Sequence, residues 1–200
     1  MIALIKYKAG NLSSVMNALD RLGAGYYLAE TPEQLNAADG VILPGVGHAK
    51  AAMESLEGLG IANWLKKTDK PMLGICVGMQ LLFDTSSEGN TVGLGVIPGE
   101  LTRFESDTEK VPHMGWNTFY GDFTHPLLKG IDPASHVYFV HSYFVADSKF
   151  TVASCKYINP FIAVVAKDNY MGVQFHPEKS GKVGAQILQN FLDLVYQAGG

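Results

Sequence analysis

The most informative stretch of the sequence is Pro71-Met72-Leu73-Gly74-Ile75-Cys76-Val77-Gly78-Met79-Gln80. Its first half is apolar and reads as the end of a buried strand, and residues 79–83 suit the first turns of a helix. A strand that enters a helix through G-x-C-x-G is the cysteine form of the nucleophile elbow. Glycine flanks the cysteine because the turn is too sharp for a side chain there. The same pentapeptide also suits a buried structural cysteine between two packing glycines.

An elbow would place the Cys76 thiol at the N-terminus of the following helix. There the helix dipole and free N–H groups favour the thiolate, which is the nucleophilic form of cysteine. The other cysteine, Cys155, follows Val152-Ala153-Ser154 in an apolar segment, and we expect it to lie in the core.

The composition predicts one globular domain over residues 1–200, since 47% of the residues are hydrophobic. The net charge is −4 and no basic patch stands out, which argues against a nucleic-acid partner. Two cysteines are too few for a disulfide framework and fit a reducing cytoplasm. The N-terminus lacks a signal-peptide pattern, and no apolar run approaches the roughly 18 residues of a membrane span. We therefore expect a soluble, cytoplasmic protein without a membrane partner.

Short buried strands alternate with helices in the first half of the chain. Strands are expected at residues 2–7, 26–28, 40–43 and 72–75, and helices at 12–22, after Thr31, at 49–56 and at 61–67. Thr31-Pro32-Glu33-Gln34 combines an N-cap, a first-turn proline and a capping-box glutamine. This alternation predicts a parallel α/β sheet.

The second half of the chain is richer in short strands, glycine and aromatic residues. Strand-like segments cover residues 99–104, 116–120, 137–143, 151–156, 161–167 and 171–175, and a helix with one apolar face follows at 181–196. The expected fold is therefore α/β: an open, mixed, mostly parallel sheet flanked by helices, with an antiparallel portion in the second half.

Three stretches follow predicted strands: residues 44–47, the Cys76 elbow and the corner at His176-Pro177-Glu178. In open α/β sheets ligands bind beyond the carboxyl ends of the strands, so we expect these stretches to converge. His176 and Glu178 would share one side of an extended segment. A histidine beside a thiol can accept its proton, while a carboxylate orients the imidazole. Alone, this corner also suits an ordinary turn with a solvated glutamate.

Nucleophilic attack on a carbonyl also needs donors for the developing oxyanion. The N–H of Val77, just after the cysteine, is one candidate, and Gly45 or Val46 is the second. Residues 44–47 equally suit a plain strand-to-helix turn. The six histidines show no metal-ligand spacing such as H-E-x-x-H, so we expect neither a metal nor a cofactor.

The order Cys76…His176-Pro177-Glu178, within G-I-C-V-G and Q-F-H-P-E, resembles the class I, triad-type glutamine amidotransferases, whose fold is flavodoxin-like. Further stretches resemble one branch of that family, the glutaminase subunits of imidazole glycerol phosphate synthase in histidine biosynthesis. They are Pro44-Gly45-Val46-Gly47-His48, Pro112-His113-Met114-Gly115-Trp116-Asn117, Tyr138-Phe139-Val140-His141-Ser142-Tyr143 and Glu178-Lys179-Ser180. The resemblance spans nearly the whole chain.

The resemblance implies that Cys76 attacks the side-chain amide of glutamine and that His176 protonates the leaving ammonia, with Glu178 as the third member of the triad. Glutamine would be held by Gly47, Gln80, His141, Ser142 and Tyr143. Ammonia would pass to a (β/α)8-barrel cyclase subunit, which forms a heterodimer with this chain and makes imidazole glycerol phosphate and aminoimidazole carboxamide ribotide. The partner interface would include Asn11, Met114, Trp116, Asn117, Tyr138 and Lys179.

Three other functions remain open at this stage. The chain would serve another amidotransferase, act as a stand-alone γ-glutamyl hydrolase, or be a regulatory subunit without turnover. A stand-alone hydrolase needs an open cleft and no ammonia-retaining partner, and the intact Cys76, His176 and Glu178 argue against a subunit without turnover. By spacing alone, His113 suits a structural histidine better than a base.

Overall fold

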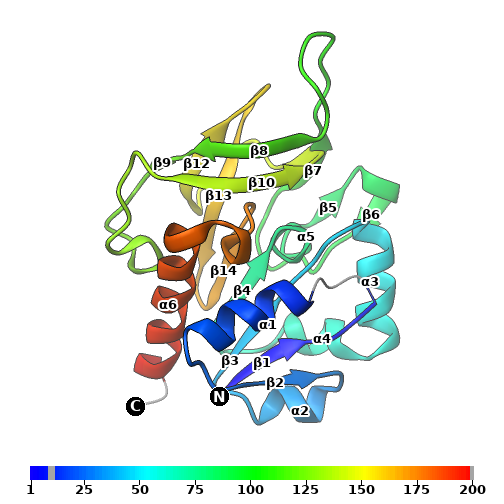
Figure 1. The fold of residues 1–200 in the computed structure, drawn as a ribbon. Coiled ribbons are helices and arrows are strands. Elements are labelled where there is room, and N and C mark those ends of the chain that lie inside the picture. Colours follow the sequence, from blue (N-terminus) through cyan, green and yellow to red (C-terminus); the bar gives the residue numbers. More distant parts are fainter. Residues whose placement is uncertain (9–11, 199–200) are drawn as a thin grey trace.

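The computed structural model describes residues 1–8 and 12–198, and an eight-stranded mixed sheet forms the centre of this part of the chain (Figure 1). The strand order is β2-β1-β3-β4-β14-β13-β12-β9. The bounds are β1 (Ile2–Ile5), β2 (Tyr26–Ala29), β3 (Gly40–Leu43), β4 (Met72–Ile75), β9 (Tyr120–Gly121), β12 (Thr151–Lys156), β13 (Pro160–Lys167) and β14 (Tyr170–Val173).

The sheet changes from parallel to antiparallel at β14. Strands β2, β1, β3, β4 and β14 pair in parallel, and β14, β13, β12 and β9 pair antiparallel. Although β14 is the last strand of the chain, it lies beside β4, with Val173 opposite Ile75. This insertion brings the end of β14, and hence His176, next to the end of β4, and the predicted mixed sheet is confirmed.

Two smaller sheets complete the strands. Strands β8 (His113–Thr118) and β10 (His136–His141) form an antiparallel pair. The other sheet contains β11 (Tyr143–Phe144), β7 (Glu100–Arg103), β5 (Thr85–Ser86) and β6 (Thr91–Val92). In Figure 1 the β8–β10 pair lies across the antiparallel end of the main sheet, above β13.

Helices cover both faces of the parallel half. Figure 1 shows α1 (Leu12–Arg21) and α6 (Gly181–Ala198) on the near face, and α3 (Ala49–Gly58) and α4 (Ile61–Leu65) on the other. The remaining helical segments are α2 (Pro32–Asn36), α5 (Val77–Gln80), η1 (Glu88–Asn90), η2 (Pro126–Leu128) and η3 (Pro177–Lys179). The predicted capping box is confirmed at α2, where Thr31 caps the helix and Gln34 bonds back to it.

Two local predictions were wrong. The helix expected over residues 79–83 is the single turn α5, because the next carbonyl groups bind a loop instead: Leu81 O accepts from Leu94 N, and Leu82 O from Val96 N. The His176 corner is not extended throughout, since residues 177–179 form the 3₁₀ turn η3, closed by a hydrogen bond from Lys179 N to His176 O.

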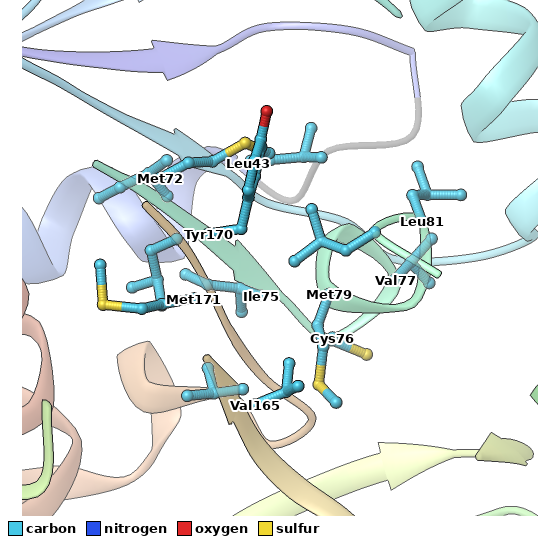
Figure 2. Close-up of a cluster of buried hydrophobic side chains, with 14 of the residues drawn as sticks. Leu43, Met72, Ile75, Cys76, Val77, Met79, Leu81, Val165, Tyr170 and Met171 are labelled. Carbon is cyan, nitrogen blue, oxygen red and sulfur yellow. The ribbon is translucent and has the colours of Figure 1, made fainter. Parts of the chain in front are cut away.

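Strand β4 runs through the centre of the core. All four of its residues are buried, between β3 on one side and β14 on the other. Figure 2 shows Met72 and Ile75 of this strand together with Leu43 and Tyr170 from its neighbours, and Cys76 at the strand's end. None of the helices in residues 1–8 and 12–198 is both long enough and apolar enough to cross a membrane.

Candidate active site

The turn at Cys76 has the strained geometry of a nucleophile elbow. Cys76 has φ 53° and ψ −110°, a region that non-glycine residues adopt at a cost of about 1–3 kcal/mol. A Cβ at Gly74 would lie 2.6 Å from Gly78 O, and a Cβ at Gly78 would lie 1.9 Å from Leu43 O. Both glycines are therefore required by close backbone contact, as the G-x-C-x-G reading expects. Because α5 is one turn long, helix-dipole stabilisation of the thiolate is weaker than the sequence suggests.

The Cys76 side chain is buried but polar groups surround it. Its residue is 3% exposed, its Sγ lies 3.7 Å from the Val140 carbonyl oxygen, and Gln174 Nε2 donates to Sγ at 3.8 Å. Gln174 was not among the predicted site residues. It comes from the end of β14, and only the β4–β14 pairing shows that it faces the thiol.

His176 and Glu178 form a buried pair at the end of β14. His176 Nδ1 lies 2.7 Å from Glu178 Oε1, and the two side chains are 1% and 2% exposed. Among the described residues His176 Nε2 has no hydrogen-bond partner, which leaves this nitrogen for a reacting group. Burial lowers the pKa of His176. The negative charges of Cys76 and Glu178, with their hydrogen bonds to the ring, outweigh this effect and raise the pKa from 6.5 to about 10. The raised pKa favours the imidazolium form of His176.

Backbone contacts hold this histidine in place. Its N–H donates to Tyr138 O at 2.9 Å, and its carbonyl accepts from Ser180 Oγ at 2.6 Å. Ser180 Oγ also accepts from Tyr138 N at 2.9 Å. Both the N–H and the carbonyl group of Tyr138 therefore bind strand β10 to the corner after β14.

A cavity of about 260 Å³ lies in front of these groups. It is lined by Val46, Gly47, Cys76, Val77, Gln80, Glu88, Pro112, Val140, His141, Ser142, Tyr143 and His176. The structure thus brings together nearly all predicted catalytic and glutamine-binding residues. Gly45 lies beneath this surface, where a Cβ would come within 2.6 Å of Gly78 N and 2.8 Å of Val77 Cβ.

Glu88 is a site residue that the sequence reasoning missed. It lies in η1, and its Oε2 accepts a hydrogen bond from Ala49 N at 2.6 Å, at the start of α3. Its neighbours, Ser86, Ser87, Gly89 and Asn90, read as an ordinary polar turn. No local pattern therefore marks Glu88, and only the packing of η1 on α3 brings its carboxylate to the cavity.

The predicted interface residues of strands β8 and β10 lie on two different faces of this pair. Met114 and Trp116 are exposed, and the Trp116 ring packs edge-on against Tyr138, its cross-strand partner, at 5.9 Å between centroids. Asn117 alternates to the other face, where its Nδ2 donates to Lys156 O at 3.0 Å. Lys179 is exposed in η3. The predicted Asn11 lies outside the described residues.

Two further residues lie where the sequence places them. Cys155 is fully buried in β12, and burial raises the pKa of its thiol to about 12. His113 is buried in β8, where its ring stacks on Tyr157 with 4.3 Å between centroids.

The comparison with known families identifies this arrangement. The model of the "Glutamine amidotransferase class-I" family matches residues 4–195. The chain belongs to this family.

Solved structures have the same fold at low sequence identity. A glutamine amidotransferase has a TM-score of 0.76 at 17% identity, covering 98% of each chain. PurLQS from Thermotoga maritima has a TM-score of 0.73 at 20% identity, covering 97% of this chain and 98% of its own.

Curated relatives of this class-I glutamine amidotransferase are much more similar. The imidazole glycerol phosphate synthase subunit HisH of Bacteroides fragilis is 48% identical over 195 residues, which cover 96% of this chain and 99% of the relative. The subunit HisH of Methanosarcina acetivorans is 48% identical over 198 residues, covering 96% and 98%.

Proposed function

We propose that this chain is the glutaminase subunit of imidazole glycerol phosphate synthase, acting as one glutamine amidotransferase domain in the cytoplasm. It hydrolyses glutamine to glutamate and ammonia and passes the ammonia to a cyclase subunit. The observation that carries the proposal is the meeting of the Cys76 elbow with the His176–Glu178 pair at one cavity, in a chain 48% identical to HisH subunits.

Cys76 is the proposed nucleophile. Its thiolate forms a C–S bond with the side-chain amide carbon of glutamine, and the amide oxygen becomes an oxyanion. We assign the role of oxyanion donor to the N–H of Val77 and to the loop at Gly45 and Val46. His176 then gives its proton to the amide nitrogen, the C–N bond breaks, and ammonia leaves a glutamyl thioester.

The second half of the reaction uses the same histidine in the opposite direction. The neutral imidazole takes a proton from water, the hydroxide attacks the thioester, and glutamate leaves as the thiolate is restored. Glu178 holds His176 through the 2.7 Å contact and stabilises the imidazolium that both halves need. The raised pKa of His176 fits this role, because the ring is charged when the thiolate attacks.

The cavity offers groups that suit glutamine. Gln80 is held in place, since its Nε2 donates to Tyr143 O at 3.0 Å and to Gln174 Oε1 at 3.1 Å, which leaves its own oxygen to accept from a ligand. The Glu88 carboxylate complements the α-ammonium group. Gly47 and the backbone of His141 and Ser142 complete the surface against which the substrate would lie.

The outer face of the β8–β10 pair is proposed to meet the cyclase. Met114 and Trp116 are exposed apolar side chains beside Tyr138, and such aromatic anchors are typical of interfaces. Lys179 adjoins Glu178 directly, so a partner that covers it would close the region of the triad and retain ammonia.

The test is an assay of the purified chain with glutamine, with and without its cyclase partner and the acceptor substrate. We expect glutamate and imidazole glycerol phosphate in a one-to-one ratio from the complex. Absence of glutamate from the active complex would contradict glutaminase function. Full glutaminase activity without any binding to the cyclase would indicate a stand-alone hydrolase instead.

Trp116→Ala tests the interface within the same assay. It should uncouple glutamate release from product formation, while synthesis with added ammonia persists through the cyclase. Tyr120→Ala is the matched control, because Tyr120 is equally exposed, at 55% against 56%, but lies on β9. A one-to-one ratio in Trp116→Ala would show that Trp116 serves only packing.

A further inference from the structure

Two buried histidines face each other on the inner side of the β8–β10 pair. His113 and His141 are cross-strand partners, and they are 4% and 5% exposed. His113 Nδ1 lies 3.1 Å from His141 Nε2, while His141 Nδ1 lies 2.9 Å from the carbonyl oxygen of Tyr143. Asn117 Nδ2 lies 3.4 Å from His113 Nε2. The mechanism proposed above gives the imidazole rings of this pair no role.

Hydrogen-bond logic fixes the protons of both rings. A carbonyl oxygen only accepts, so His141 Nδ1 carries a proton and donates to Tyr143 O. Burial lowers the pKa of His141 to about 3 and that of His113 to about 4, so both rings are neutral. His141 Nε2 therefore accepts, His113 Nδ1 donates to it, and His113 Nε2 accepts from the Asn117 amide. All the hydrogen bonds run in one direction, from Asn117 to Tyr143 O.

This series of bonds continues to the nucleophile. The Tyr143 oxygen that His141 binds also accepts from Gln80 Nε2 at 3.0 Å. Gln80 donates its second amide proton to Gln174 Oε1 at 3.1 Å, and Gln174 donates to Cys76 Sγ at 3.8 Å. The orientation of the Gln80 amide at the cavity, and of the Gln174 amide behind it, thus depends on a carbonyl group that the histidine pair holds.

We propose that His113 is a positioning residue for the glutaminase site, acting through His141 and the Tyr143 carbonyl to orient Gln80 in the glutamine cavity. The proposal rests on the glutaminase function proposed above. His113 does not touch the reacting atoms; the nearest member of the series that lines the cavity is His141. Strand β8 also presents Met114 and Trp116 outward, so one strand joins the proposed interface to this series of bonds.

The first test compares three substitutions of His113 in the complex with the cyclase. His113→Phe keeps a ring for stacking on Tyr157 and Phe139 but gives His141 no donor. His113→Asn loses the ring but places an amide nitrogen near the former Nδ1, and His113→Gln places it nearer the former Nε2. We expect His113→Phe and His113→Gln to raise KM for glutamine about tenfold, with kcat changed much less. His113→Asn should stay within about threefold of the parent.

A purely structural role predicts the reverse order, because phenylalanine preserves the packing and asparagine does not. Val195→Ala in α6 serves as a control for lost stability, since Val195 is fully buried, packs near Gly40 at the start of β3 and does not line the cavity. It should leave KM unchanged. If His113→Phe has the parent's KM, or if KM follows thermal stability across all variants, the positioning role is wrong.

The second test reads the protons directly, by nitrogen-15 NMR of the histidine rings in the unmodified chain. Both His113 and His141 should be neutral Nδ1–H tautomers at neutral pH. In His113→Phe, His141 should keep this tautomer, because Tyr143 O still accepts from its Nδ1, while the nitrogen-15 signal of its Nε2 should shift with the loss of the hydrogen bond from His113. An Nε2–H tautomer in either ring would overturn the proposal. If the unmodified complex releases no glutamate, the proposed function is wrong. The NMR measurement would still test the hydrogen bonds of the histidine pair independently.

Discussion

The chain's two cysteines lie in two buried regions that differ in geometry. Cys76 ends β4 in a strained turn, with φ 53°, and faces a cavity. Cys155 lies in β12 with regular pairing to Phe161 of β13, and its Sγ meets the carbonyl of Lys156 at 3.9 Å. Their exposed fractions, 3% and 0%, are nearly the same.

Exposure therefore does not distinguish the proposed nucleophile from the other thiol in this protein. Burial raises the pKa of Cys155 to about 12, because a thiolate there would lose its hydration. Cys76 faces a histidine whose pKa the thiolate itself helps to raise. The comparison teaches that two features define the proposed site. The glycines around Cys76 permit the strained turn, and the β4–β14 pairing brings the charged neighbour beside it.

Substitution of each cysteine should give the largest contrast. Cys76→Ser is expected to lower glutaminase kcat by about 10³-fold or more, because serine is a far weaker nucleophile at this histidine. Cys155→Ala should leave kcat within about twofold, since it changes only packing. The measurement is glutamate release by the complex at saturating glutamine. Equal losses of kcat in Cys76→Ser and Cys155→Ala would contradict the proposed difference between the two cysteines.

The turn itself can be tested through Gly78. Gly78→Ala places a Cβ 1.9 Å from Leu43 O and forces the backbone apart, so we expect a loss of about 3 kcal/mol in the free energy of unfolding. Gly58→Ala is the control, because no atom lies within 4 Å of a Cβ there and the residue is in α3. It should be neutral or stabilising in urea denaturation. A neutral Gly78→Ala would contradict the close packing of the elbow.

The charged neighbour can be weakened through Glu178. Glu178→Gln retains an oxygen that accepts from His176 Nδ1 but removes the negative charge that helps raise the pKa of His176. We expect kcat to fall about 30-fold, less than for His176→Asn, together with slower alkylation of Cys76 by iodoacetamide. Full activity in Glu178→Gln would remove this carboxylate from the triad.

The last comparison concerns the neutral pair His113 and His141, of which His141 lines the cavity. His113 and His141 have folded-state pKa values of about 4 and about 3, so the unfolded chain binds more protons below pH of about 6.5. Stability should therefore fall as pH drops from about 6.5 to about 4, by about 1.4 kcal/mol per pH unit for each histidine.

His113→Phe should remove about half of that slope, whatever it does to the absolute stability. Urea titrations at several pH values measure it. A slope that is the same in the variant and the parent would show that His113 is charged in the folded protein, contrary to the proposed hydrogen bonds.

Much of the fold was accessible from the sequence. Strands β1, β3 and β4 follow from apolar runs, and the glycines around Cys76 fix the elbow, because these features depend on neighbouring residues. The length of α5 was not accessible, since the loop at residues 93–97 supplies the competing N–H groups. The roles of Glu88 and Gln174 depend on how distant strands and turns pack, and no local spacing encodes that. The inward side of Asn117 follows from strand alternation, since Asn117 adjoins the outward Trp116.

The central claim is that the elbow cysteine, and not the strand cysteine, reacts with glutamine. The most direct measurement is peptide mass spectrometry of the complex after treatment with an alkylating glutamine analogue. The account predicts one adduct per chain, on Cys76, and protection by excess glutamine. An adduct on Cys155, or labelling that glutamine does not reduce, would contradict it.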